Sequence, residues 1–287
     1  MRALKWPPLR ATVAPMREMI NAARLFFLWV GLLIVGVAVL MVFVLPARSY
    51  AQDLDSAARY RDCLRLVEVD PDQAFDQAME WRTNGGGPAA RHCEALALVE
   101  LKLYGEAAVR LGDLADAPGS GEPEDRAALL AQAGNAWLLA GSGENAAIAL
   151  TAALNLTPGD TGFLVDRGRA YAAAGDFAAA EADLNQALAI RPDAADVLVL
   201  RAGAKRAQGK LDGASEDISR ALALQPDGPY VLVERGAIRL AQGDDAGARA
   251  DWVAVARIVG EVGPEHPDAE ALKDAQRSLE DLDVDKP

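Results

Sequence analysis

The sequence has little of the chemistry that active sites and metal sites need. Its 287 residues include only two histidines and two cysteines, and 6% of them are aromatic. His92 and Cys93 are adjacent on a predicted helix, where neighbouring side chains point about 100° apart and do not face each other. Two Cys and two His so widely dispersed form no zinc site. We therefore expect no catalytic, cofactor-binding or metal-binding residue and no small-molecule substrate.

Basic residues are also scarce after residue 50. Residues 51–287 hold 23 basic and 41 acidic residues, a net charge of −18. A surface with this charge repels phosphate backbones, so nucleic acid is excluded as an expected partner.

The chain has one long apolar run. Residues 25–45 contain no charge, and as a helix they would extend about 31 Å, enough to cross a bilayer. The basic segment 1–24 carries five basic residues and predicts that this end stays in the cytoplasm while the chain after Pro46 is exported. We interpret residues 25–45 as a transmembrane anchor or a signal-peptide core. Cleavage near Ala51, which would leave a secreted or periplasmic protein, stays open.

Helical patterns fill the rest of the chain. Residues 52–126 predict degenerate helical hairpins, and a strict period of 34 residues begins at Ala127. We number the periodic units repeat 1 (127–160), repeat 2 (161–194), repeat 3 (195–228) and repeat 4 (229–260). Residues 266–283 predict a C-terminal capping helix.

Small residues and breakers recur at fixed positions of the repeats. Glycine or alanine stands where two helices approach closely, glycine ends each first helix, alanine lies on each second helix, and proline follows it. These columns are Gly134, Gly168, Ala202 and Gly236; Gly141, Gly175, Gly209 and Gly243; Ala146, Ala180, Ala214 and Ala248; and Pro158, Pro192 and Pro226. Such helix pairs pack closely and bury their apolar faces only by stacking.

At these residues the chain resembles the tetratricopeptide repeat family. Gly168, Tyr171, Ala180, Leu184 and Pro192 match its pattern best. The resemblance covers residues 88–260 if Tyr104, Ala107 and Leu111 are counted as an earlier, displaced repeat. It implies an all-α, right-handed α-solenoid of stacked helix-turn-helix repeats, here behind an N-terminal hydrophobic helix.

Charged residues form a further periodic column. Arginine occupies the seventh position and aspartate the twenty-third in three repeats, whereas both positions are alanine in repeat 1, at Ala133 and Ala149. Because the charges occur together or not at all, we predict that the two positions touch across each hairpin. The predicted structural ion pairs are Arg167 with Asp183, Arg201 with Asp217, and Arg235 with Asp251.

The resemblance also implies a partner-binding groove along the first helices of the repeats. The positions that meet the ligand in the family correspond here to Asn135, Leu138, Val165, Arg169, Val199, Arg206, Tyr230 and Val233, among others. Arg169 and Arg206 either orient a ligand carboxylate or pair with acidic neighbours, Asp196 among them.

Cys63 and Cys93 lie on the first helices of two neighbouring predicted hairpins. Neighbouring first helices run side by side in the family, so a disulfide is plausible in an exported protein. Two buried free thiols are the alternative.

Together these features predict a non-enzymatic scaffold or adaptor in the cell envelope that binds a peptide or protein, with the membrane contacted through residues 25–45. The alternative is a recruiting subunit of an envelope enzyme complex, without catalytic residues of its own.

Overall fold

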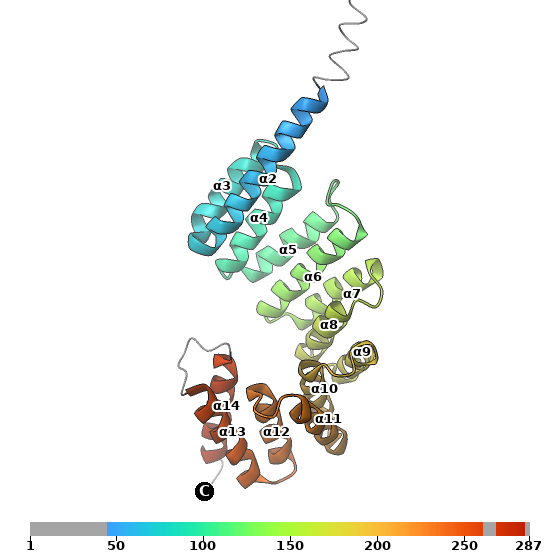
Figure 1. Ribbon diagram of the computed structural model, residues 1–287, viewed down its shortest axis with the longest axis vertical. Helices are drawn as coiled ribbons and strands as arrows, with labels where there is room; N and C mark the ends of the chain where they lie inside the picture. Colours follow the sequence, from blue (N-terminus) through green and yellow to red (C-terminus); the bar gives the residue numbers. More distant parts are fainter. Residues whose placement is uncertain (1–44, 261–267, 285–287) are drawn as a thin grey trace, which may run out of the picture. The chain divides into compact units, whose positions relative to one another are not determined.

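The computed structural model describes residues 45–260 and 268–284. Every regular element in these ranges is an α-helix (Figure 1). The helices are α2 (Leu45–Val69), α3 (Pro71–Thr83), α4 (Gly87–Glu100), α5 (Tyr104–Ala115), α6 (Pro123–Leu139), α7 (Gly143–Leu156), α8 (Thr161–Ala173), α9 (Phe177–Ile190), α10 (Ala195–Ala207), α11 (Leu211–Leu224), α12 (Pro229–Ala241), α13 (Asp245–Gly260) and α14 (Ala269–Val284).

The predicted basic segment 1–24 lies outside the described residues, and so does the predicted membrane segment 25–45 except for Leu45. Within the described ranges, no helix combines the length and the apolar character needed to cross a membrane. α2 begins at Leu45, so Ala51, near which cleavage was left open, lies inside a helix.

The contacts divide the chain into two compact units, residues 1–61 and 62–287. In the first unit, the described side chains belong to α2, where Arg59 Nε lies 3.0 Å from Asp55 Oδ2.

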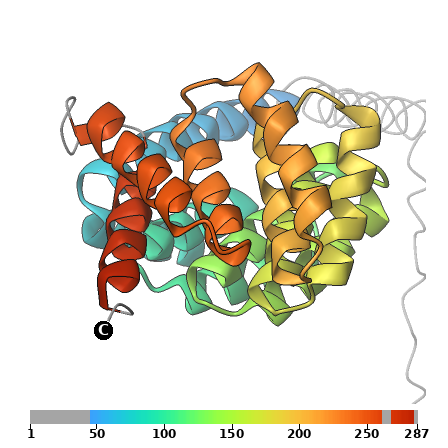
Figure 2. The same ribbon diagram turned by 90° about the horizontal axis from the view of Figure 1, so that it is seen from below.

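Within the second unit, the predicted repeats fold as successive helical hairpins. Repeats 1 to 4 form the pairs α6 and α7, α8 and α9, α10 and α11, and α12 and α13, and each pair contacts the next one (Figures 1 and 2). The first helices also touch each other in order, because α6 contacts α8, α8 contacts α10, and α10 contacts α12.

Small residues let the two helices of each pair approach closely. A Cβ added to Gly134 would lie 2.6 Å from Leu150 Cγ of the second helix. The alanines predicted at the second-helix contact, Ala146, Ala180, Ala214 and Ala248, are all fully buried. The glycines that end the first helices have φ between 74° and 85°, a left-handed conformation that side chains with a Cβ rarely adopt.

α4 and α5 form the displaced earlier repeat. Ala95, Lys102, Ala107 and Leu111 occupy the places that Gly134, Gly141, Ala146 and Leu150 hold 39 residues later, and three of them are buried. Lys102 takes the left-handed turn with φ of 61° where the later repeats use glycine.

α14 closes the C-terminal end. Its buried residues Ala271, Ala275 and Leu282 pack in one cluster with Trp252 and Val255 of α13. The predicted capping helix 266–283 therefore corresponds to Ala269–Val284. An apolar cap covers the face of repeat 4 that has no following repeat.

Candidate functional site

The eight predicted groove residues lie on four consecutive first helices. We call the surface that they form the first-helix face: Asn135 and Leu138 on α6, Val165 and Arg169 on α8, Val199 and Arg206 on α10, and Tyr230 and Val233 on α12. Because these helices contact one another in order, the face is continuous from α6 to α12.

Apolar side chains run along the middle of the first-helix face. Val165, Val199 and Val233 share the fifth position of their repeats, and each is half-buried against the adjoining core. Leu138 is half-buried against the core of repeat 1. A partner that covers these residues would remove further apolar surface from water.

At the α6 and α8 end, the face is polar. Asn135 Nδ2 donates to Asp166 Oδ2 at 3.2 Å. Asp166 also lies near Arg169, with 3.7 Å between Asp166 Oδ1 and Arg169 Nη1, and the Arg169 side chain is 55% exposed. Exposed pairs of this kind contribute about 0 to 1 kcal/mol, so little holds Arg169 in this position.

Arg206 is held more firmly. Its Nε donates to Glu234 Oε1 at 2.6 Å and its Nη2 to Glu234 Oε2 at 3.3 Å, joining α10 to α12. Burial raises the pKa of Glu234 above its ordinary value, and Arg206 opposes that shift. Asp196 was wrongly expected among the partners of the two arginines; its carboxylate lies 3.7 Å from Arg191 instead, because Asp196 is in the first turn of α10, next to the loop that carries Arg191.

Tyr230 stands at the other end of the face and is 44% exposed. Burial raises its pKa, and the nearby carboxylates of Asp268, Asp274 and Glu270 raise it further. The face therefore ends in acidic surroundings where α14 begins.

The three predicted ion pairs form across the hairpins. Each arginine donates from Nε and Nη2 to both oxygens of its aspartate, at 2.7 and 2.8 Å for Arg167 with Asp183, 2.8 and 2.5 Å for Arg201 with Asp217, and 2.9 and 2.5 Å for Arg235 with Asp251. The three aspartates are buried. Two parallel bonds fix the relative position of the helices as well as neutralising the charge.

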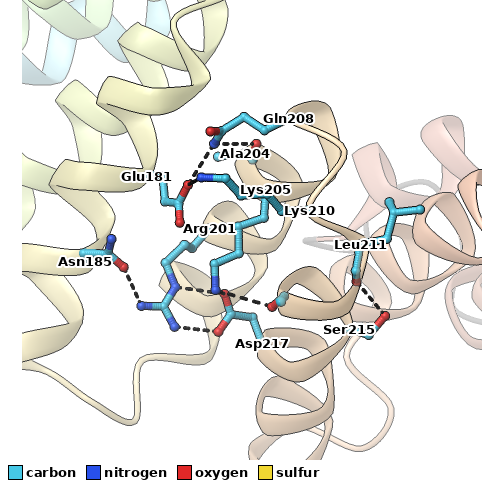
Figure 3. A network of polar contacts seen from close by, with 11 residues as sticks. Glu181, Asn185, Arg201, Ala204, Lys205, Gln208, Lys210, Leu211, Ser215 and Asp217 are labelled. Atoms are coloured by element: carbon cyan, nitrogen blue, oxygen red, sulfur yellow. Dashed lines mark hydrogen bonds and ion pairs between the residues drawn. The ribbon is translucent and has the colours of Figure 1, made fainter.

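Further contacts, absent from the sequence-based prediction, surround these pairs. Lys205 Nζ lies 2.9 Å from Asp217 Oδ2, and Arg239 Nη1 lies 2.8 Å from Asp251 Oδ2. Both cations follow the pairing arginine by four residues, a helical spacing that could have revealed them. Arg201 also donates to Asn185 Oδ1 of the preceding repeat at 2.7 Å (Figure 3).

The same pair of positions is charge-reversed in the displaced repeat. Glu94, which is 2% exposed, contacts Arg110, and its other oxygen lies 3.3 Å from Arg82 Nε. Glu94 and Arg110 are separated by 16 residues, as are Arg167 and Asp183. Because the acid precedes the arginine here, the pattern of arginine at the seventh position and aspartate at the twenty-third did not reveal this pair.

Cys63 and Cys93 form a disulfide in the structure, with a Cα to Cα distance of 6.3 Å. It joins α2 to α4, two neighbouring first helices. In the part of the chain that the structure describes, no group of three or more His, Cys, Asp or Glu residues is placed to hold a metal ion.

These features define a helical repeat protein in which buried ion pairs join the two helices of the displaced repeat and of repeats 2 to 4. Residues 171–235 match the family described as tetratricopeptide repeat, so the chain contains tetratricopeptide repeats. None of the curated proteins matches the sequence.

Solved structures resemble the fold. The C-terminal part of a TPR repeat-containing protein from Cytophaga hutchinsonii is 16% identical, with a TM-score of 0.54 over 78% of this chain and 92% of that one. A MamA RS-1 ArsTM double mutant is 18% identical, with a TM-score of 0.50 over 66% and 98%. The first TPR of Spaghetti (RPAP3), bound to HSP90 peptide SRMEEVD, is 28% identical over 42% and 95%, with a TM-score of 0.40.

Proposed function

We propose that this chain is a non-enzymatic interaction scaffold that binds a peptide or protein partner on the first-helix face. The observation that carries the proposal is the row of half-buried valines, Val165, Val199 and Val233, on three consecutive first helices. A single exposed apolar residue is ordinary on a protein surface, whereas a row across three packed helices offers a continuous contact.

The chemistry of the face favours an extended or helical peptide. Apolar side chains of the partner would contact the valines and supply affinity. Arg169 is the better candidate for orienting the partner, because its pair with Asp166 is long and exposed while Arg206 is bonded to Glu234. The sequence alone offers no reason to prefer either arginine. Their contacts favour Arg169 over Arg206 as the residue that orients the partner.

We further propose that the repeats lie on the exported side of the cytoplasmic membrane. The support is the basic segment 1–24 followed by the apolar residues 25–45. Protease added to cells with a permeabilised outer layer should digest the repeats. Protection until the inner membrane is broken would contradict this topology.

A recruiting role within an envelope enzyme complex is compatible with the same face and would appear as an enzyme among the captured partners.

Affinity capture from detergent-solubilised membranes tests the binding face. The double variant Val199→Glu, Val233→Glu should lose a partner that the wild-type chain retains. Val253→Glu is the matched control, because Val253 is 52% exposed on α13, away from the first helices. Equal capture by the wild type and the double variant, with helicity and melting temperature unchanged, would remove the partner from this face.

The arginines are tested separately with the captured partner. Arg169→Ala should weaken binding more than Arg206→Ala, measured by titration of the purified proteins. The reverse order would show that Arg206 leaves Glu234 to bind the partner.

A further inference from the structure

The second helix of each repeat also contacts the first helix of the next repeat, outside the first-helix face. At the junction between repeats 1 and 2, the side chains differ from those at the same repeat positions of the junction between repeats 2 and 3. At this junction an open cleft of about 450 Å³ lies between α7 and the end of α8. Its lining residues are Glu144, Ala147, Ile148, Thr151, Tyr171, Ala174 and Asp176.

At the junction between repeats 2 and 3, side chains of the protein form a polar clasp at the same positions. Glu181 takes the place of Ala147, Gln208 that of Ala174, and Lys210 that of Asp176. Glu181 Oε2 accepts from Gln208 Nε2 at 2.9 Å and from Lys210 Nζ at 2.7 Å (Figure 3). Gln208 Nε2 also donates to the Phe177 carbonyl at 3.0 Å. Repeat 3 thus brings its own cation to this junction.

At the junction of repeats 1 and 2, no lysine stands at the place of Lys210. Arg167 donates to the lining residue Thr151 at 3.2 Å, but its charge is already paired with Asp183. Asp176 replaces the lysine, and Glu144 stands on the first turn of α7. Asp176 Oδ1 accepts the Ala179 amide at 3.0 Å. Neither carboxylate forms an ion pair with a described residue, in contrast to Glu181.

The floor between these carboxylates is small and apolar. Ala147 is 7% exposed, Ile148 is 68% exposed, and Tyr171 packs against the core of repeat 1. α7 lies directly on the end of α8, because a Cβ added to Gly143 would come 2.6 Å from the Ala174 amide nitrogen. The cleft therefore has a closed apolar floor and an acidic rim.

We propose that this cleft binds a lysine or arginine side chain of a partner peptide. The methylene stem lies on Ala147, Ile148 and Tyr171, and the cationic end pairs with Glu144 and Asp176. The occupant follows from charge complementarity and from the chain itself, since Lys210 pairs with Glu181 at the corresponding junction one repeat later. The cleft is separate from the first-helix face and does not depend on the function proposed for that face.

Two fluorescein-labelled peptides test the chemistry with the full chain in detergent micelles. One is Gly-Leu-Lys-Ser-Gly-amide with the label on its amino terminus, and the other has norleucine in place of lysine, which keeps the stem and removes the charge. Fluorescence anisotropy should show at least tenfold tighter binding of the lysine peptide, with the difference shrinking as salt is added. Equal binding of the two peptides would overturn the proposal.

Exchanging the two junctions tests the location. Ala147→Glu, Ala174→Gln, Asp176→Lys copies the polar clasp into the cleft and should abolish binding of the lysine peptide. The reciprocal variant Glu181→Ala, Gln208→Ala, Lys210→Asp opens the clasp but should add no second binding site. Ala178, Ala182 and Lys205 stand there in place of Glu144, Ile148 and Tyr171. Wild-type affinity of the first variant for the lysine peptide, with helicity retained, would overturn the proposal.

Because three simultaneous substitutions can disturb folding, a single charge reversal provides a second test of the cleft. Glu144 is exposed, so Glu144→Lys should fold and weaken lysine-peptide binding at least tenfold; unchanged affinity would place the peptide elsewhere. Val199→Glu, Val233→Glu should leave peptide binding unchanged. This control separates failure at the cleft from failure of the first-helix face.

Discussion

Repeats 1 and 3 are equivalent hairpins whose two helices are joined by opposite kinds of contact, apolar in repeat 1 and ionic in repeat 3. In repeat 1, Ala133 is buried and Ala149 packs against the same apolar cluster. In repeat 3, Arg201 donates twice to the buried Asp217 at the corresponding positions. The comparison shows that the two positions are one structural unit, because a charge at either position requires its opposite at the other.

The displaced repeat adds a third arrangement, with the acid on the first helix and the arginine on the second. Glu94 and Arg110 keep the contact and exchange the signs. The hairpin thus requires a matched pair at this place rather than an arginine at one residue.

The largest expected effect comes from removing the acid of a charged pair. Asp217→Ala leaves both Arg201 and Lys205 without their carboxylate in a site where their side chains are 13% and 15% exposed. We expect a loss of about 3 to 5 kcal/mol in the free energy of unfolding, measured by urea titration.

Two matched variants sharpen this comparison. Asp183→Ala should cost less, because Arg167 keeps Thr151 and the Tyr171 ring and no second cation pairs with Asp183 in the described contacts. The triple variant Arg201→Ala, Lys205→Ala, Asp217→Ala imitates repeat 1 and should be more stable than Asp217→Ala alone. A triple variant less stable than the single one would contradict the interpretation of the pair as a coupled unit.

The disulfide is expected to have the next largest effect. It closes a sequence separation of 30 residues, which corresponds to about 3 to 4 kcal/mol in the chain-entropy model. Cys63→Ser should lower the stability of the hairpins before repeat 1 more than that of repeats 2 to 4, as measured by hydrogen exchange. Finding two free thiols on protein purified from its native compartment would show that the bond does not form there.

A smaller effect is expected at the turn between the two helices of a hairpin. Lys102 holds φ of 61°, whereas Gly175 stands at the same turn with φ of 81° and open space around its missing Cβ. Lys102→Gly should stabilise the protein by about 1 kcal/mol and Gly175→Ala should destabilise it by a similar amount. Thermal melts of both variants check the opposite signs.

The smallest expected effect distinguishes two buried carboxylates by their pH dependence. Burial opposes ionisation of Asp217, but hydrogen bonds from Arg201 and Lys205 lower its pKa below the ordinary value. Its stabilising contribution is present above the pKa of the unfolded chain and is lost as the pH falls through the folded value. Glu234 has a raised pKa, so its contribution is present at low pH and is lost as the pH rises through the folded value.

Amide variants make these opposite signs measurable. Between pH 3 and pH 7, Asp217→Asn should become progressively less stable relative to the wild type, and Glu234→Gln progressively more stable. Parallel trends for the two variants in chemical denaturation would contradict the assigned directions.

The sequence was informative where one repeat could be compared with the next. The 34-residue period located the helix pairs, and the absence of half-charged pairs identified contacts such as that between Arg167 and Asp183. The reversed Glu94 and Arg110 pair was missed because its repeat begins 39 residues before repeat 1, out of phase with the others.

Contacts that occur only once could not be predicted in this way. The pair between Arg206 and Glu234 joins neighbouring first helices and has no counterpart elsewhere in the repeats. The lining residues of the cleft beside Ile148 all differ from their counterparts one repeat later, and these differences matter only once their places in the junction are known. The partner of the first-helix face is determined by another molecule, so the sequence and the fold supply only the chemistry of the surface.

The intra-repeat ion pairs bear on how such a chain can change its length. Both members of each pair lie within one 34-residue unit, so duplicating or excising a whole unit carries a buried aspartate and its arginine together. Removing residues 195–228, for example, would leave Arg167 with Asp183 and Arg235 with Asp251. It would also remove Arg206 and leave the largely buried Glu234 without its partner. Genetic recombination in register therefore keeps every buried aspartate with its arginine, and Glu234 is the carboxylate that would lose its partner if repeat 3 were removed. Recombination out of register would separate the aspartates from their arginines as well.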